Sequence, residues 1–425
     1  MARMPARLAA RIAARLLPLL LPVLLPASLR AFATDGQACP SGNAWDVAMA
    51  MCMPTPDEGG STLSAHAGAF AVQSSLPGPR GGNRFAAPNW IMLDAGTSAG
   101  PGRRLDLELM ATTEVWSFPR TGYPELLQVG EERADGQPYV DAQHPHSSPL
   151  MALTLAWTQA LASGRSLRLS FAPRGASSDG PVAFMHRPSA RDDPDAPLGH
   201  HVGQDVGHIS STVFAARWSA GRVTLEASAF NGAEPAPTHV DLPLATPDSW
   251  AVRATVEHAP GHSLAASFAR VRQEDGMYPG SRVAQRWSAS HADHVEAGPA
   301  AALDHTLVLG MITRDGPSPA LRSLLDEGVL ARGRYDAWWR LEALQRTADE
   351  LALPATATSE SVRWVQALTL GGTRWWAPSG HWQLGAGASL TLDRLPQEWS
   401  AAYGGRTPLT ARLIVQLRAD GRWQH

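Results

Sequence analysis

Histidines and aspartates gather in one stretch of the chain, between Asp179 and Ser211. The stretch contains four histidines and four further aspartates: His186, His200, His201, His208, Asp192, Asp193, Asp195 and Asp205. Imidazole and carboxylate groups together suit zinc or copper(II). We therefore expect a metal site among His186, His200, His201, Asp205 and His208. Because neighbouring side chains point apart in an extended chain, only one of His200 and His201 is expected to join His186 and His208. The alternative is that these histidines order a long loop through hydrogen bonds.

Other chemical groups are sparse. Cys39 and Cys52 are the two cysteines, and in an oxidising compartment they are expected to close a small disulfide loop. The sequence has no GxSxG, HExxH or phosphate-loop motif, so an enzyme is disfavoured. Ser210 and Ser211 beside His208 leave a barrel-borne hydrolase as an alternative. His144 and His146 are expected to be solvated.

The histidine-rich stretch resembles a family of Gram-negative outer-membrane β-barrel proteins that has no established activity. Four runs carry the resemblance: AFMHR at 183–187, the pair at 200–201, DVGHIS at 205–210 and AFNGAEP at 229–235. Val206 and Gly207 depart from the Ser or Ala and the Thr found there in the family. The resemblance covers about 180–235 closely and implies a barrel in the outer membrane.

The elements that must position these residues show an alternating pattern. In the clearest run, Trp382, Leu384 and Leu390 alternate with polar or small residues such as Ser389 and Asp393. A period of two places the two sets on opposite faces of a strand. Repeated runs of this length behind an export signal are typical of a transmembrane β-barrel. Fourteen strands are expected, at 89–97, 104–116, 151–157, 166–173, 209–218, 222–231, 250–258, 263–272, 283–291, 303–314, 334–346, 361–371, 381–393 and 409–418.

The predicted fold is thus an all-β antiparallel transmembrane barrel of about fourteen strands, with twelve to sixteen possible and with long external loops. Short and long connections alternate until about residue 314, beyond which the pattern blurs. Residues such as Glu226, Arg253 and Arg340 fall on the inner face. These charges could pair across a narrow interior or line a wet pore.

The N-terminus has the features of a secretory signal. Four arginines precede an apolar core at 16–27, and Ala31-Phe32-Ala33 fits a cleavage site. The domain prediction is a signal peptide at 1–33, a loosely ordered segment at 34–85 and a barrel at 86–425. No later stretch reaches the roughly 18 apolar residues of a transmembrane helix.

Composition narrows the function classes. The 425 residues carry a formal net charge of -3, which gives no argument for nucleic-acid binding. The expected location is the cell outer membrane, with outer-membrane lipid and the barrel-assembly machinery as partners. Such machinery reads a terminal aromatic residue, for which Trp423 is the candidate. The expected function is a narrow channel or a surface component that handles a small solute or a copper or zinc ion. The alternatives are a structural or adhesive barrel and the hydrolase.

Overall fold

The computed structural model describes residues 43–46, 51–54, 60–133, 135–146, 148–205, 207, 209–237, 239–242, 244–272, 281–298, 301–316, 318–354, 361–379 and 382–424. The chain divides into Met1–Asp35 and Gly36–His425. The expected signal peptide at 1–33 and Cys39 lie outside the described residues, so the cleavage site and the disulfide stay predictions. Cys52 lies in a small hairpin formed by β1 (Asn43–Asp46) and β2 (Met51–Pro54).

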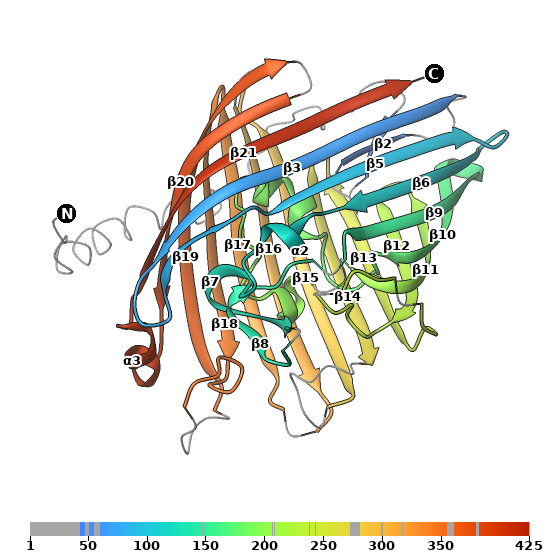
Figure 1. Cartoon of the computed structure of the whole chain (residues 1–425). Coiled ribbons are helices and arrows are strands. Elements are labelled where there is room, and N and C mark those ends of the chain that lie inside the picture. Colours follow the sequence, from blue (N-terminus) through green and yellow to red (C-terminus); the bar gives the residue numbers. More distant parts are fainter. Residues whose placement is uncertain are drawn as a thin grey trace. The chain divides into compact units, whose positions relative to one another are not determined.

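Antiparallel strands close a barrel, with β21 paired to β3 at the seam (Figure 1). Within the described residues it has sixteen strand positions, because β4 and β5 pair in turn with β3 and share one position. The strands are β3 (Ser61–Leu76), β4 (Gly82–Ala86), β5 (Asn89–Ser98), β6 (Arg103–Ala111), β9 (Leu150–Leu161), β10 (Arg165–Gly175), β11 (Ser210–Ala220), β12 (Val223–Asn231), β13 (Ser249–Ala259), β14 (His262–Arg272), β15 (Val283–Glu296), β16 (Ala301–Arg314), β17 (Leu321–Arg332), β18 (Tyr335–Arg346), β19 (Arg363–Ser379), β20 (Trp382–Arg394) and β21 (Leu409–Gln424).

The barrel thus has sixteen strand positions rather than about fourteen, and the two that the sequence pattern missed are β3 and β17. β3 begins at Ser61, within the range expected to be loosely ordered, and its small residues give little contrast between faces. β17 carries leucines on both faces of the strand. Two of them, Leu321 and Leu325, point into the barrel and are buried there. An apolar inner face removes the period-two signal.

Once β17 is included, short turns and long connections alternate around the whole barrel. The turns at one rim are 99–102, 162–164, 221–222, 260–261, 297–300, 333–334 and 380–381, and the connections at 112–149, 176–209, 232–248, 273–282, 315–320, 347–362 and 395–408 lie at the other. We call these the short-turn rim and the long-loop rim. In outer-membrane barrels the turns face the periplasm and the longer loops face outward.

The two faces of the wall differ as the alternation predicts. On β20, Trp382, Leu384 and Leu390 lie on the outer face and are 45%, 41% and 51% exposed. Ser389 and Asp393 face the interior and are buried. The outer face therefore presents an apolar surface suited to lipid. Among the described residues, no helix is long and apolar enough to cross a membrane.

Two of the long connections fold into the barrel instead of extending from it (Figure 1). The connection 112–149 contains α2 (Glu114–Ser117), β7 (Tyr123–Glu132) and β8 (Pro138–Gln143). The connection 176–209, called here the inserted segment, contains η2 (Phe184–His186), η3 (Pro188–Ala190) and η4 (His200–Gln204). Residues of both pack against wall residues in one apolar cluster, which includes Leu126, Leu198, Leu344 and Val365. The remaining short elements are η1 (Ala162–Gly164), η5 (Gln397–Trp399) and α3 (Ser400–Tyr403).

Candidate metal centre

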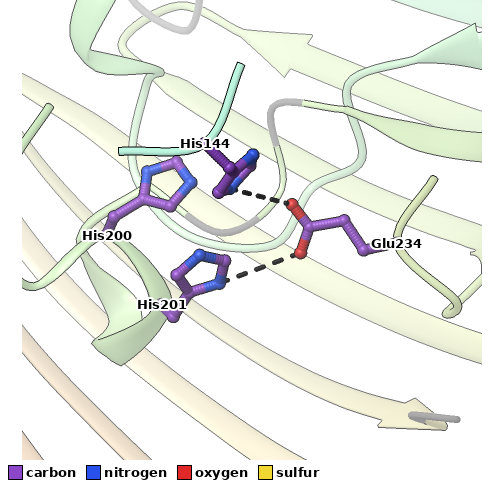
Figure 2. A group of neighbouring side chains, drawn as sticks. All are labelled: His144, His200, His201 and Glu234. Carbon is purple, nitrogen blue, oxygen red and sulfur yellow. Dashed lines mark ion pairs between the residues drawn. The ribbon is translucent and has the colours of Figure 1, made fainter. Parts of the chain in front are cut away.

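Three long connections meet at a group of four potential metal ligands (Figure 2). His144 follows β8, His200 and His201 open η4, and Glu234 follows β12. One ligand atom from each residue can be chosen so that all four lie within 4.8 Å of one another. The folding of the loops thus brings together residues that lie up to 90 positions apart in the sequence, from His144 to Glu234.

The adjacent His200 and His201 both reach this group because their backbone is not extended. η4 is a π-helical turn that is kinked at Val202 and at Gly203, where φ is 78°. The two rings are 4.5 Å apart at their centroids and nearly perpendicular. The expectation that only one of the pair would join a site, which assumed an extended chain, was wrong.

Two glycines allow η4 to lie in direct contact with the wall. A Cβ on Gly310 of β16 would lie 2.0 Å from the carbonyl oxygen of Val202, and a Cβ on Gly203 would lie 2.8 Å from the Cα of Gly310. Ser323 of β17 donates a hydrogen bond of 2.6 Å to the same Val202 carbonyl. Only glycine permits backbones to approach this closely. The wall therefore fixes the turn that carries two of the four ligands.

The ring of His144 is oriented for metal binding. Its Nδ1 lies 3.0 Å from the carbonyl oxygen of Pro145, to which it can only donate, so Nε2 keeps its lone pair. That Nε2 is 3.8 Å from one carboxylate oxygen of Glu234, and Nδ1 of His201 is 3.8 Å from the other. A lone pair facing a carboxylate at this distance makes no hydrogen bond. A cation with bonds of about 2.0–2.2 Å would satisfy both atoms.

Burial favours the neutral form of the His144 and His201 imidazoles. Burial, with a contribution from the neighbouring His200, lowers the pKa of His144 to about 3. Burial, again followed by His200, holds the pKa of His201 well below its ordinary value. His201 Nε2 is also buried and has no hydrogen-bond partner among the residues that the structure describes. Three histidines with one carboxylate form a ligand set that suits zinc or copper(II).

The structure brings together only part of the predicted site. His200 and His201 belong to the group, whereas Asp205 lies behind His200, with its Oδ2 3.5 Å from Nδ1 of that ring. His186 is buried elsewhere, with its ring 5.8 Å from Trp90, and is not one of the four residues. Its inclusion in a site stays a prediction, because its expected partner His208 cannot be placed. His208 lies outside the described residues.

Sequence reasoning missed His144 and Glu234. His144, expected to be solvated, is buried, and so is His146, whose Nδ1 is 2.5 Å from Glu114. Glu234 lies in the AFNGAEP run that supported the family resemblance, which was the available signal for it. For the hydrolase alternative, Ser210 and Ser211 are buried at the start of β11, and His208 is outside the described residues.

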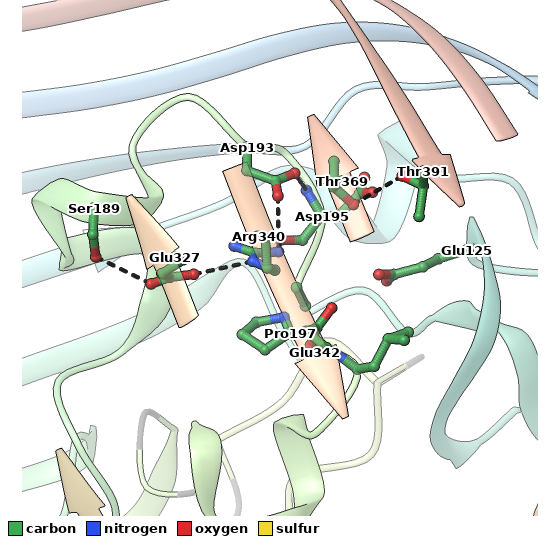
Figure 3. A network of polar contacts seen from close by, with 12 residues as sticks. Glu125, Ser189, Asp193, Asp195, Pro197, Glu327, Arg340, Glu342, Thr369 and Thr391 are labelled. Atoms are coloured by element: carbon green, nitrogen blue, oxygen red, sulfur yellow. Dashed lines mark hydrogen bonds and ion pairs between the residues drawn. The ribbon is translucent and has the colours of Figure 1, made fainter. Parts of the chain in front are cut away.

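Buried ion pairs hold the inserted segment against the wall (Figure 3). Arg340 of β18 contacts Asp193 of the segment at 3.1 Å and Glu327 of β17 at 3.0 Å. Glu327 in turn accepts a hydrogen bond of 2.7 Å from Arg187 of the segment. Among the described residues, five further pairs join the segment to the wall: Asp179–Arg286, Arg191–Asp304, Arg191–Asp336, Asp195–Arg412 and Asp192–Arg418. These wall charges are therefore paired with the inserted segment.

The interior is not completely filled. A cavity of about 320 Å³ lies beside the inserted segment, with an apolar wall that includes Trp90 and Phe184 and a polar side that includes His66, Gln383 and Arg418. His66, Gln383 and Arg418 lie in the parts of their strands near the short-turn rim. Space for water and small solutes therefore remains on that side of the segment.

Comparison with known proteins supports the fold. No protein-family model and no curated protein matches the sequence. Among solved structures, Salmonella typhi OmpF in complex with daunomycin matches with a TM-score of 0.53 at 9% identity, covering 84% of this chain and 98% of that one. An anion-selective porin from Comamonas acidovorans matches with a TM-score of 0.50 at 12% identity, covering 86% and 100%. At this identity the likeness concerns architecture alone, and the chain has the fold of an outer-membrane porin barrel.

Proposed function

We propose that the protein is an outer-membrane channel whose lumen is narrowed by two folded-in connections, and that these connections, together with Glu234 of a third connection, bind one transition-metal ion. The barrel lies in outer-membrane lipid after export and assembly. The metal centre consists of His144, His200, His201 and Glu234.

The size of the barrel and its contents support a narrow channel. Sixteen-stranded barrels are wide enough to leave an aqueous path. Here the connection 112–149 and the inserted segment occupy much of that path, and the cavity of about 320 Å³ beside them has room only for small solutes. We therefore expect low conductance, with passage of water, ions and small molecules.

One observation carries the metal proposal, namely that the four ligand atoms lie within 4.8 Å of one another although three separate connections supply them. The approach of two acceptor atoms, Nε2 of His144 and a carboxylate oxygen of Glu234, to 3.8 Å supports a cation between them. All three connections belong to the long-loop rim, so the ion would enter from outside the cell.

Metal titration of the refolded full chain tests this site. We expect one Zn²⁺ or Cu²⁺ ion per chain. In His201→Ala and in Glu234→Ala the affinity for the ion should fall by roughly tenfold to a hundredfold or more. His239→Ala is the matched control, because His239 lies in the same connection as Glu234 but is 64% exposed. His186→Ala should also leave the affinity unchanged. Equal binding by His201→Ala, Glu234→Ala and the parent chain would show that the ion binds elsewhere.

Planar-bilayer recording tests the channel. Small, regular current steps are expected from the parent chain. A folded barrel that inserts and passes no current would instead support the structural or adhesive alternative.

A further inference from the structure

A small cavity lined by carboxylates lies between the folded-in connections and the wall, and we call it the carboxylate cavity. Glu125 of β7 and Asp195 of the inserted segment line it from within, and Glu342 of β18 and Asp393 of β20 line it from the wall. Figure 3 shows Glu125 reaching from β7 toward the strand that carries Glu342. The free volume of about 10 Å³ has room for roughly one water molecule or one bare ion.

The two guanidinium groups of the carboxylate cavity do not balance its negative charges. Arg412 of β21 is paired with Asp195 at 3.0 Å. Arg340 of β18 is paired with Asp193 and Glu327, neither of which lines the cavity. The lining therefore carries four carboxylates and two guanidinium groups, an excess of two negative charges when all of them are ionised. Such an excess is costly inside a protein unless a cation balances it.

Three of the four carboxylates have no cationic partner. Within the part of the chain that the structure describes, Glu125, Glu342 and Asp393 take part in no ion pair. Glu342 accepts a hydrogen bond of 2.6 Å from the backbone N–H of Leu198, and Glu125 accepts one of 3.2 Å from the side-chain amide of Gln128. Asp393 is 2% exposed, and its Oδ2 is buried with no hydrogen-bond partner among the described residues. A buried carboxylate oxygen in this state indicates a ligand beside it.

The side chains that line the carboxylate cavity offer oxygen atoms as metal ligands. Besides the carboxylates, Thr369, Thr391 and Thr410 line it, and the hydroxyl oxygens of Thr369 and Thr391 are 2.9 Å apart. Carboxylate and hydroxyl oxygens suit hard cations, whereas zinc and copper favour nitrogen or sulfur. Calcium accepts roughly six to eight oxygens in an irregular arrangement, while magnesium keeps several waters, for which this cavity has no room. The double charge of calcium also equals the excess negative charge.

We propose that the carboxylate cavity binds one calcium ion through Glu125, Asp393 and the threonine hydroxyls, and that the ion fastens β7 to the wall. Glu125 belongs to a folded-in connection and Asp393 to a wall strand, so a shared ion joins the two. Asp393 and Thr410 lie next to the connection 395–408, which belongs to the long-loop rim, so calcium reaches the site from outside the cell. The cavity shares no lining residue with the candidate metal centre, and the two ions therefore bind independently.

Calorimetric titration of the refolded, chelator-treated full chain with calcium chloride tests the site. We expect one Ca²⁺ per chain with a dissociation constant of about 1 mM or lower, as in extracellular calcium modules. Glu125→Gln and Asp393→Asn each remove a charge at nearly constant size and should weaken binding by roughly tenfold or more. Asp135→Asn is the matched control, because Asp135 lies in the same connection as Glu125 but its side chain is 61% exposed. A parent chain that shows no saturable binding at millimolar calcium would overturn the proposal.

Thermal unfolding separates a lost ligand from a misfolded chain. In excess chelator, Asp393→Asn should unfold at the same temperature as the parent or at a higher one, because it removes a buried charge that lacks a partner. In millimolar calcium the parent should become more stable, and Asp393→Asn should gain less. An equal loss of stability in Asp393→Asn with and without calcium would refute the calcium site, because the carboxylate would then stabilise the fold by itself. An unfolding temperature of the parent that calcium leaves unchanged would refute it in favour of protonated carboxyl groups.

Variants of the two sites, each titrated with both metals, show whether calcium and zinc bind apart. Glu234→Ala, which should lose affinity for zinc, should bind calcium as the parent chain does. Asp393→Asn should in turn bind zinc as the parent chain does. Loss of calcium binding in Glu234→Ala would contradict the proposal, because the calcium ion would then lie at the candidate metal centre.

Discussion

Glu327 is the carboxylate whose removal should most directly loosen the inserted segment. It is 1% exposed on β17, and it accepts hydrogen bonds from Arg187 and Ser189 of the segment at 2.7 and 3.2 Å. Its other oxygen accepts from Arg340 at 3.0 Å. In Glu327→Ala, Arg340 keeps its contact with Asp193, whereas the contacts that remain to Arg187 include the carbonyl oxygens of Val182 and Gln204, both within the segment.

The size of the effect follows from the burial of these groups. Removing one partner of a buried ion pair costs about 3–5 kcal/mol, because the remaining charge stays out of water. Arg187 would return to water if the segment undocked. The free-energy cost of its unpaired charge therefore destabilises the docked state relative to the undocked state. At about 1.4 kcal/mol per tenfold, the ratio of docked to undocked segment should fall by roughly two to three and a half orders of magnitude.

Planar-bilayer recording should show this change as larger or more frequently fluctuating currents in Glu327→Ala than in the parent. Glu398→Ala is the control, because Glu398 pairs with Arg363 at 2.6 Å in an exposed position, where an ion pair contributes little. If Glu327→Ala and the parent give the same currents and the same thermal stability, the buried network does not hold the segment.

Two further predictions concern the wall. Gly310→Ala should displace the carbonyl of Val202 and weaken metal binding, measured by zinc titration, whereas Gly372→Ala, whose added Cβ would meet its nearest atom at 3.6 Å, should not. Leu390→Arg should lower the free energy of unfolding from liposomes in urea by roughly 2–4 kcal/mol if it lies near the midplane, because Leu390 is 51% exposed on the lipid face. A loss of zinc binding in Gly372→Ala, or unchanged stability in Leu390→Arg, would contradict these assignments.

The sequence predicted the fold where one face of a strand is apolar and the other is polar. β20, with Leu384 and Leu390 outside and Ser389 inside, shows this contrast and was located correctly. β17 was missed because Leu321 faces inward and packs against Val202 of the inserted segment, which is itself inside the barrel. The contents of the barrel therefore changed the pattern of the wall, which local periodicity cannot anticipate.

The sequence predicted the kind of ligands in the candidate site, histidine with a carboxylate, but not which residues supply them. The pair His200 and His201 was identified from the density of histidines and aspartates in one stretch. Their convergence depends on the kink at Gly203, and the other two ligands come from connections that lie far away in sequence. Neither a turn of this kind nor contacts between distant loops leaves a periodic trace in the sequence.

The ion pairs of the inserted segment also bear on the order in which the protein assembles. The segment precedes in the chain all the wall residues that bind its charges, including Arg286 on β15, Glu327 on β17 and Arg412 on β21. Its charges gain these partners only as the later strands are added, and β21 is also the strand that closes the seam with β3. If the ring closed first, this charged segment would have to enter through the narrow mouth of the barrel. Its charges would then lose their hydration before they reached their partners, which costs free energy. The sequence order thus favours a barrel that is built around its contents, with the last strand both completing the charge network and closing the wall.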